Sequence, residues 1–198
     1  MHNQARQRGF SMIELIIVIV IILVVAAIAI PSVMTAMYNI RLRSSGSEVA
    51  GLMQSGRMRA IRDNRTYPLS CTPQPLNNCT TLFVDTQNPP FGSGIWNSAD
   101  GAAVQLPGTV RFSTAGFPAM PAGTMGFNGA LVNAPIYFNS RGMPCVMGVG
   151  GVCTPSGFVF YFQDQRPLGA NGYGAVAITP AGRVKVYSYN VTNGWFQS

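Results

Sequence analysis

Residues 6–32, RQRGFSMIELIIVIVIILVVAAIAIPS, form an almost unbroken apolar run that carries one acid, Glu14, near its start. From Phe10 to Pro31 there are 22 residues, and only Ser11 and Glu14 interrupt the apolar character. At a rise of about 1.5 Å per residue, this run makes about 33 Å of helix, which is enough to cross a bilayer once. An ionised side chain inside a bilayer costs roughly 2.5–3.5 kcal/mol, so we expect Glu14 to have a function there.

A cleavable secretory signal is one alternative interpretation of this run. Arg6 and Arg8 precede it as a basic segment, and Ala27-Ile28-Ala29 fits a small-x-small cleavage site. Three features oppose this alternative. The run is longer than the usual core of about 7–15 residues, it contains an acid, and its most conspicuous small residue, Gly9, lies before it.

The segment RGFSMIELI (residues 8–16), together with the β-branched run and Pro31, is similar to the class III signal of type IV pilins and of the pseudopilins of type II secretion. This resemblance implies that a prepilin peptidase cuts after Gly9 and that the new N-terminal residue, Phe10, is N-methylated. It also implies that Glu14 is the family's glutamate at the fifth mature position and that Pro31 is the helix-weakening proline at the twenty-second.

The same resemblance suggests a role for Glu14, which would pair with the N-terminal amine of Phe10 in a neighbouring subunit of an assembled filament. Opposite charges attract more strongly in an apolar bundle than in water, but only subunits in register benefit. We therefore expect Glu14 to position subunits rather than to add net stability. The alternative is a tolerated acid whose side chain reaches the membrane interface from the start of the helix.

The resemblance implies an α+β, type IV pilin-like fold, in which a long N-terminal helix packs on a C-terminal antiparallel β-sheet head. Four segments are expected: a leader peptide (1–9), a transmembrane and polymerisation helix (10–31), an amphipathic continuation (32–65) and a β-rich extracytoplasmic head (66–198). Composition agrees with a β-rich head, because charged residues make up only 10% of the chain and Gly (22) and Pro (14) are frequent. The formal charge is +7 for the precursor and +5 without the leader.

The helical continuation is loosely amphipathic, with apolar positions at Ile40, Val49, Leu52, Met53 and Ala60. The small residues 44–47 weaken the helix pattern midway, so we expect bends at Pro31 and near Gly46. The last turns are rich in arginine, which suits the negative partial charge of a helix C-terminus. These arginines are Arg57, Arg59, Arg62 and Arg65. Beyond this helix, strand-like fragments occur at 81–84 and 94–96.

Four cysteines form two locally spaced pairs. Two disulfides, Cys71–Cys79 and Cys145–Cys153, are favoured among the three possible connectivities, because each pair encloses a short segment of a translocated domain. A zinc site of four thiolates is the alternative, but neither pair has the tight spacing of zinc ribbons.

A strand–turn pattern recurs three times, in VRFSTAGFP (110–118), IYFNSRGMP (136–144) and VAITPAGRV (176–184). Each copy has alternating apolar residues followed by a glycine, which predicts a strand and then a turn that needs a positive φ. We expect copies of one hairpin unit to build the sheet. These segments also resemble the β-domain of the H-type minor pseudopilins and of the FimT/FimU-like minor pilins.

Enzymatic chemistry has little basis in this sequence, and no metal or cofactor is expected. The only histidine, His2, lies in the predicted leader, and the acids beyond Glu14 are widely separated. A membrane-anchored enzyme is therefore the most distant alternative.

The C-terminal segment RVKVYSY (183–189) places Arg183, Lys185, Tyr187 and Tyr189 on one face of a strand by alternation. Two cations beside two aromatic rings are typical of a strip that binds a nucleic-acid backbone and stacks on bases. In FimT-like minor pilins a glycine-arginine-x-arginine element at this place binds DNA, and here Lys185 replaces the second arginine. The alternative is an ordinary solvated strand face.

The combined prediction is a single-pass inner-membrane minor pilin or pseudopilin with its head in the periplasm. It would join a periplasmic or surface filament, and its function would be structural. The expected partners are other pilins or pseudopilins, the prepilin peptidase, inner-membrane lipid before assembly, and either secreted proteins or DNA. The leader does not separate type II secretion from a DNA-capturing type IV pilus, because both systems use it.

Overall fold

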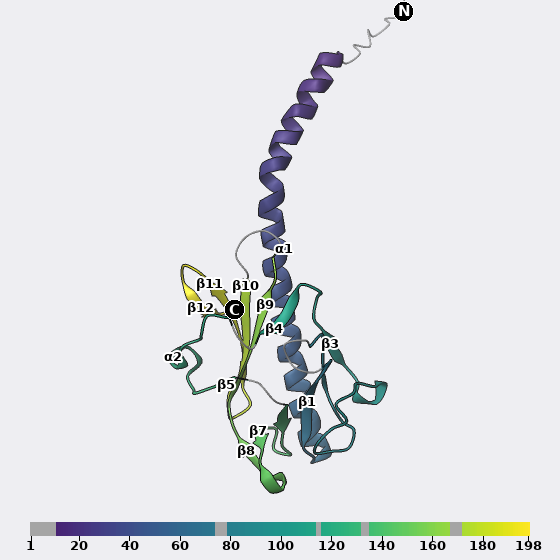
Figure 1. Cartoon of the computed structure of the whole chain (residues 1–198), viewed down its shortest axis with the longest axis vertical. Coiled ribbons are helices and arrows are strands. Elements are labelled where there is room, and N and C mark those ends of the chain that lie inside the picture. Colours follow the sequence, from purple (N-terminus) through teal and green to yellow (C-terminus); the bar gives the residue numbers. More distant parts are fainter. Residues whose placement is uncertain (1–10, 74–78, 114–115, 132–134, 167–171) are drawn as a thin grey trace, which may run out of the picture. The chain divides into compact units, whose positions relative to one another are not determined.

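The computed structural model describes residues 11–73, 79–113, 116–131, 135–166 and 172–198 (Figure 1). The chain divides into two compact units, residues 1–37 and residues 38–198. The long helix α1 (Met12–Asp63) begins in the first unit and ends in the second, and Pro31 lies inside it. The second unit, which we call the head, contains the β-strands.

Helix α1 ends at Asp63, two residues before the predicted end at 65, and a Schellman arrangement at Asn64 closes it. Asn64 has a positive φ of 50°. The backbone N–H groups of Asn64 and Arg65 donate to the carbonyl oxygens of Ile61 and Ala60 over 3.3 and 3.1 Å. These bonds occupy carbonyls that would otherwise lack partners at the helix end.

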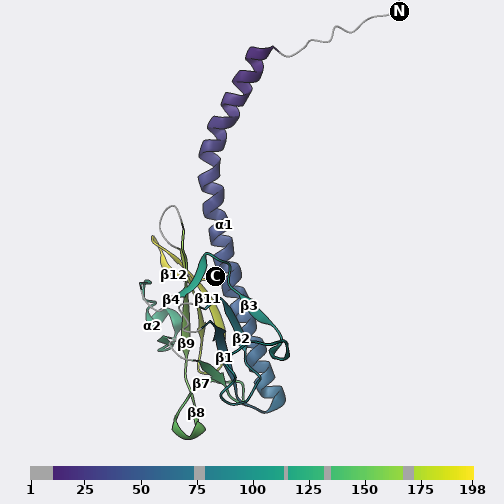
Figure 2. The same ribbon diagram turned by 45° about the vertical axis from the view of Figure 1, so that its right-hand side comes forward.

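The head contains two β-sheets rather than the one sheet expected. The first sheet has the strand order β3-β2-β1-β6-β7-β8. Its strands are β1 (Tyr67–Thr72), β2 (Thr81–Val84), β3 (Ala103–Gln105), β6 (Ile136–Phe138), β7 (Pro144–Met147) and β8 (Cys153–Pro155). All pairings in this sheet are antiparallel. In Figures 1 and 2 the β7–β8 hairpin projects beyond the neighbouring strands.

The second sheet has the order β12-β11-β10-β9-β4, and β5 pairs with β9 in parallel. Its strands are β4 (Val110–Ser113), β5 (Ala130–Leu131), β9 (Phe158–Asp164), β10 (Gly172–Ile178), β11 (Val184–Asn190) and β12 (Gly194–Gln197). Among the residues that the structure describes, short helical segments between strands are η2 (Ser98–Asp100), α2 (Ala122–Met125) and η3 (Val149–Gly151). The expected α+β fold, a long apolar helix packed on antiparallel sheets, is confirmed.

The main hydrophobic core lies between α1 and both sheets. Phe158, Phe160 and Phe162 of β9 contribute to this core, whereas Val159 and Tyr161 belong to a second cluster with Met120 and Met125. Since successive side chains of a strand point to opposite faces, both faces of β9 are covered. This explains why β9 is a continuous apolar run without a polar alternation.

Two glycines of α1 allow the helix backbone to approach the sheets closely. A Cβ atom on Gly46 would lie 2.8 Å from Val186 Cγ1, and one on Gly56 would lie 2.7 Å from Val84 Cγ2. The small residues around Gly46 therefore pack against the second sheet, and α1 continues through them as helix. Buried Ser45 and Gly46 make this contact without interrupting the helix, and the expected bend near Gly46 remains a prediction.

The other local expectations have mixed outcomes. Val49, Leu52, Met53 and Ala60 are buried as predicted, but Ile40 is 66% exposed. Residues 81–84 form β2, whereas residues 94–96 are irregular. This irregular stretch begins with Gly94, whose backbone N–H donates to the Asp85 carboxylate instead of to a neighbouring strand.

Candidate assembly helix and head surfaces

The first part of α1 presents an uncovered apolar surface. Large apolar side chains from Met12 to Ile30 are 46–84% exposed. In the part of the chain that the structure describes, α1 is the one helix long and apolar enough to cross a membrane. Burying such side chains is worth roughly 1.5–3 kcal/mol each, so this surface requires lipid or other subunits as partners.

Glu14 lies in the first turn of this helix and is exposed. Its backbone N–H donates to the carbonyl oxygen of Ser11 over 3.0 Å. It is the only charged residue between Arg8 and Arg41. Gly9 and Phe10, the predicted cleavage and methylation positions, lie outside the described residues.

Pro31 is accommodated within α1, where it removes one backbone N–H donor. The hydroxyl of Thr35 donates to the carbonyl oxygen of Pro31 over 3.0 Å. The predicted role of Pro31 as the position of a bend remains a prediction.

In the head, two of the three repeated strand–turn segments meet at Arg57 of α1. The turns at 139–142 and 179–182 share one hydrogen-bond pattern, in which the N–H of Gly142 or Gly182 donates back to residue 139 or 179 over 2.8 or 2.7 Å. Arg57 Nη1 donates to the carbonyl oxygen of Gly182 over 2.9 Å. A Cβ atom on Gly182 would lie 2.9 Å from the carbonyl oxygen of Gly142, so a larger residue at 182 would require this backbone to shift.

The glycines of all three repeats adopt positive φ, at 76° for Gly116, 72° for Gly142 and 83° for Gly182. The prediction of a positive-φ turn is therefore confirmed. The prediction of one repeated hairpin holds for β6–β7 and β10–β11 but not for the first copy, because β4 pairs with β9. No sequence pattern indicates that the second and third turns lie side by side, because their contact depends on the packing of both against Arg57.

The C-terminal strip, which consists of Arg183 and the alternate β11 residues Lys185, Tyr187 and Tyr189, is only partly exposed. Arg183 is exposed and Lys185 and Tyr189 are half-buried, but Tyr187 is 1% exposed. The Tyr187 hydroxyl donates to the carbonyl oxygen of Thr124 over 3.3 Å. Burial raises the pKa of this phenol above its usual value.

The expectation that Tyr187 stacks on a base is therefore wrong. Alternation does place Tyr187 on the same face as Lys185, but residues before and after α2 cover that part of the face, and Trp195 packs there too. The Tyr189 ring packs against Trp195 and Tyr173, with ring centroids 5.3 and 6.0 Å apart. Sequence alternation identifies a face but not the segment that covers it.

One cation of this strip, Arg183, also lines a groove together with Arg57 of α1. Arg57, Arg183 and Gln54 line a cavity of about 420 Å³ together with the apolar side chains of Met58 and Ile61. Met58 is 70% exposed. Two cations from elements far apart in the sequence therefore face one concave surface.

Residues 4–30 match the family model of the prokaryotic N-terminal methylation motif. This match supports the pilin superfamily, because the motif is the processing and methylation signal of type IV pilins and pseudopilins. A pilin-type signal implies processing by prepilin peptidase and assembly with other pilins. Searches of curated proteins and of solved structures found no match.

The signal and the fold together indicate a type IV pilin-like structural subunit, anchored in a membrane by α1 and carrying a soluble head. The match does not extend into the head, so the likeness to H-type pseudopilins and FimT/FimU-like pilins stays a prediction.

Two of the arginines near the end of α1 contact distant parts of the pilin-like head. Besides Arg57, Arg59 donates to the carbonyl oxygen of Asp100. Arg62 forms an ion pair with Asp63 over 2.8 Å, and this hydrogen-bonded partner lowers the pKa of the Asp63 carboxyl. Arg57 and Arg59 therefore contact distant parts of the head, whereas Arg62 lies in the last turn of α1 and keeps the helix-end role that the sequence suggested.

Two buried carboxylates organise the irregular segment between β2 and β3. The Asp85 carboxylate accepts hydrogen bonds from the backbone N–H groups of Gln87, Ser93 and Gly94 over 2.6–3.0 Å. The Asp100 carboxylate accepts from the N–H groups of Thr86 and Asn97. Carboxylates saturated by backbone donors have a structural role, and the described residues contain no group of three metal-ligating side chains.

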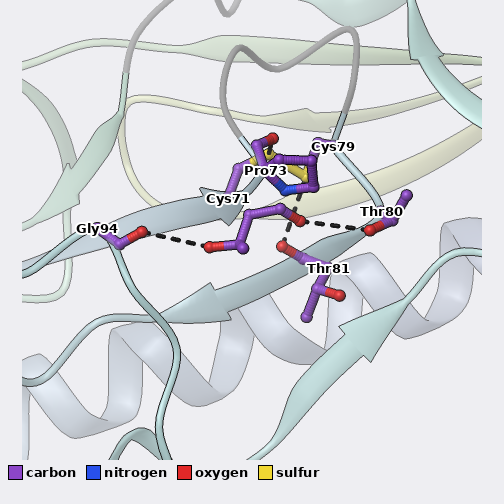
Figure 3. Close-up of a disulfide and its surroundings, with 7 residues drawn as sticks. Cys71, Pro73, Cys79, Thr80, Thr81 and Gly94 are labelled. Atoms are coloured by element: carbon purple, nitrogen blue, oxygen red, sulfur yellow. Dashed lines mark hydrogen bonds between the residues drawn. A yellow bond between two sulfur atoms is a disulfide. The ribbon is translucent and has the colours of Figure 1, made fainter.

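The structure joins Cys71 to Cys79 and Cys145 to Cys153, with Cα atoms 5.7 and 5.4 Å apart. This is the connectivity that the local spacing favours. The first disulfide links the end of β1 to the residues before β2, where the Thr80 hydroxyl donates to the Thr72 carbonyl oxygen over 3.4 Å (Figure 3). The second closes the β7–β8 hairpin.

Proposed function

We propose that this chain is a minor pilin or pseudopilin, a structural subunit of a pilus-like filament, and that its system is type II protein secretion. The observation that carries the assignment as a filament subunit is Glu14, a single exposed acid in the first turn of an otherwise uncovered apolar helix. In the membrane that acid has no benefit, whereas in a filament it selects the neighbouring N-terminus. The motif match over 4–30 supports this interpretation.

In this proposal the chain has the four segments expected from the sequence. Residues 1–9 are removed, 10–31 span the inner membrane and later form the filament core, 32–65 connect to the head, and 66–198 lie in the periplasm. Phe10 is the new N-terminus and carries the methyl group.

The processing step is tested first. Intact mass and N-terminal sequencing of the chain from its native membrane should give a protein that begins at N-methylated Phe10. A bulky substitution at Gly9 should leave the precursor uncut. A chain that begins near Ala29 would instead identify a secretory signal and reject the proposal.

The assembly step is tested with a matched pair of substitutions in α1. Glu14→Gln should leave membrane insertion intact, since the apolar residues around it suffice for a span, but should strongly reduce incorporation into sheared filaments. Glu48→Gln is the control, because Glu48 is an exposed acid on the same helix within the head. Equal incorporation of the two variants would return Glu14 to the role of a tolerated acid.

DNA capture by a type IV pilus is the second candidate function. It is favoured by the groove that Arg57 and Arg183 line together, with Lys185 close in sequence. Cations in one groove bind phosphates, and the affinity then falls as salt rises because counterions are released. Tyr189 is the remaining aromatic side chain of the strip.

The DNA candidate has a direct test with the full chain in a neutral detergent. The double substitution Arg183→Ala and Lys185→Ala should remove most binding to single-stranded DNA and reduce the magnitude of the slope of log affinity against log salt by about 1.4. Arg65→Ala is the control, because Arg65 is exposed beyond the end of α1. An intact protein without salt-dependent binding at low ionic strength would leave secretion as the function.

A further inference from the structure

A pocket in the head lies where α1 enters it, beside the tip of the β11–β12 hairpin. The pocket has a volume of about 290 Å³. Its polar lining comes from α1 and from the sheet, and it includes the side chains of Asn39, Arg43, Arg166, Ser188 and Asn190. Leu42, Val191 and Phe196 form an apolar wall on the same pocket.

The two arginines of this pocket differ in how firmly they are held. Arg166 Nη2 donates to Asn39 Oδ1 over 2.7 Å, and its guanidinium lies 5.7 Å from the centre of the Tyr38 ring. Arg166 also lies 3.8 Å from the buried Asp164 carboxylate. Arg43 is exposed and, among the described residues, forms no ion pair.

The position of Arg43 along the helix relates this pocket to a bilayer. The 26 residues from Leu15 to Ile40 carry no charge, and Arg41 and Arg43 are the first charges that follow. At about 1.5 Å per residue this uncharged length makes about 39 Å of helix. A bilayer with its headgroups is about 40–45 Å thick, so the first cations reach headgroup level when residues 15–40 together cross it, with the helix beyond Pro31 drawn into the membrane before assembly.

We propose that this pocket binds the phosphate headgroup of an anionic phospholipid in the leaflet from which the head emerges. Arg43 supplies the uncompensated positive charge that attracts the phosphate, and Arg166, held by Asn39 and paired with Asp164, forms a fixed wall of N–H donors. The apolar side chains of Val191 and Phe196 face the glycerol and upper acyl region. A cationic pocket with an apolar wall suits an amphiphilic anion better than free phosphate.

This inference rests on the membrane-anchored state of the proposed function and assigns a site to that state. Binding of the lipid headgroup would give the unassembled, membrane-anchored subunit a defined head orientation. A neighbouring subunit's carboxylate is the competing occupant, and the experiment distinguishes it from lipid.

The test measures lipid retention by native mass spectrometry. The full chain, delipidated in a neutral detergent, receives equal amounts of phosphatidylglycerol and phosphatidylcholine. Wild-type protein should retain phosphatidylglycerol preferentially. Arg43→Ala should lower this preference about fivefold, as expected for one cation at an anionic lipid surface, whereas Arg65→Ala should leave it unchanged.

A second pair of variants tests the location by adding charge. Val191→Asp places an acid at the pocket, and Val149→Asp places one at the tip of the β7–β8 hairpin. Both valines are exposed, at 80% and 102%, so neither change disturbs the core. Only Val191→Asp should reduce the retention of phosphatidylglycerol.

Three results would overturn the proposal. Equal losses from Arg43→Ala and Arg65→Ala would indicate general charge attraction. Competition by millimolar inorganic phosphate would indicate a site for free phosphate. Unchanged lipid retention with reduced filament incorporation of Arg43→Ala would assign the pocket to a neighbouring subunit. Lipid retention is measured without assembly, so its failure is distinguishable from failure of the Glu14 experiment.

Discussion

The guanidinium of Arg57 on α1 donates a hydrogen bond to the carbonyl oxygen of Gly182, 2.9 Å away and 125 residues later in the chain. The same guanidinium lies beside the turn at Gly142, because a Cβ atom there would come within 2.8 Å of Arg57 Cγ. One side chain thus ties the end of the helix to turns from both sheets.

We expect Arg57→Ala to lower the free energy of unfolding by about 1.5–3 kcal/mol, the range for a hydrogen bond that involves a charged group. Denaturant unfolding of the full chain in a neutral detergent measures this loss. Arg65→Ala removes an equal charge from an exposed position and should change the stability little. Similar losses of unfolding free energy for both variants would show that the hydrogen bond to Gly182 does not stabilise the head measurably.

Alanine substitution at two glycines of α1 should change the free energy of unfolding in opposite directions. Gly46→Ala places a Cβ atom 2.8 Å from Val186 Cγ1, and such overpacking destabilises by about 1–3 kcal/mol. Gly51 has no atom within 4 Å of the added Cβ, so Gly51→Ala should stabilise the helix by about 0.5–1 kcal/mol. Thermal unfolding of the two variants checks the signs, and a stabilising Gly46→Ala would contradict the close helix–sheet approach.

Alkaline pH should destabilise the head through two buried phenols. Burial raises the pKa of Tyr161 and of Tyr187 above the ordinary phenol value of 10.0. Because the folded-state pKa is the higher one, the stabilisation is complete below the unfolded-state pKa of about 10 and is lost as pH rises through the folded-state pKa. The unfolding free energy should therefore fall above about pH 10, and less steeply in Tyr161→Phe. An identical pH profile in wild type and Tyr161→Phe would refute this origin.

Removing the disulfide of the β7–β8 hairpin should lower stability by about 2–3 kcal/mol, the loop-closure value for a short enclosed segment. The double substitution Cys145→Ala and Cys153→Ala makes this change, and denaturant unfolding measures it. Thiol labelling of the unreduced wild-type protein should find no reactive cysteine. Stoichiometric labelling of two thiols would show that this pair is not bonded.

The helix and the repeated turns could be predicted because their signals are local. An apolar run of membrane length and a glycine that needs positive φ depend on a few adjacent residues. Asn64 could have been identified as the helix end in the same way, because asparagine tolerates the left-handed conformation.

The non-local features could not be predicted in this way. Ile40 and Val49 belong to the same helical pattern, but only Val49 meets the sheets. Tyr187 and Tyr189 alternate alike, but a segment some 60 residues earlier in the chain covers only the first, through the contact between Tyr187 and Thr124. The pocket at Arg43 joins α1 to the β11–β12 hairpin, and its two halves share no sequence motif.

The two covered faces of β9 also bear on how the chain survives translocation. Its segment Phe158–Phe162, FVFYF, contains no charge and no proline, the composition of sequences that associate into cross-β aggregates when exposed. In the native head, β9 pairs antiparallel with β10, the next strand along the chain, with Phe158 opposite Ile178 and Asp164 opposite Gly172. Such a local hairpin closes on the microsecond scale, far sooner than the contacts with α1 more than 100 residues away. Early closure against β10 would shield one edge of the most aggregation-prone segment while the rest of the head is still unfolded.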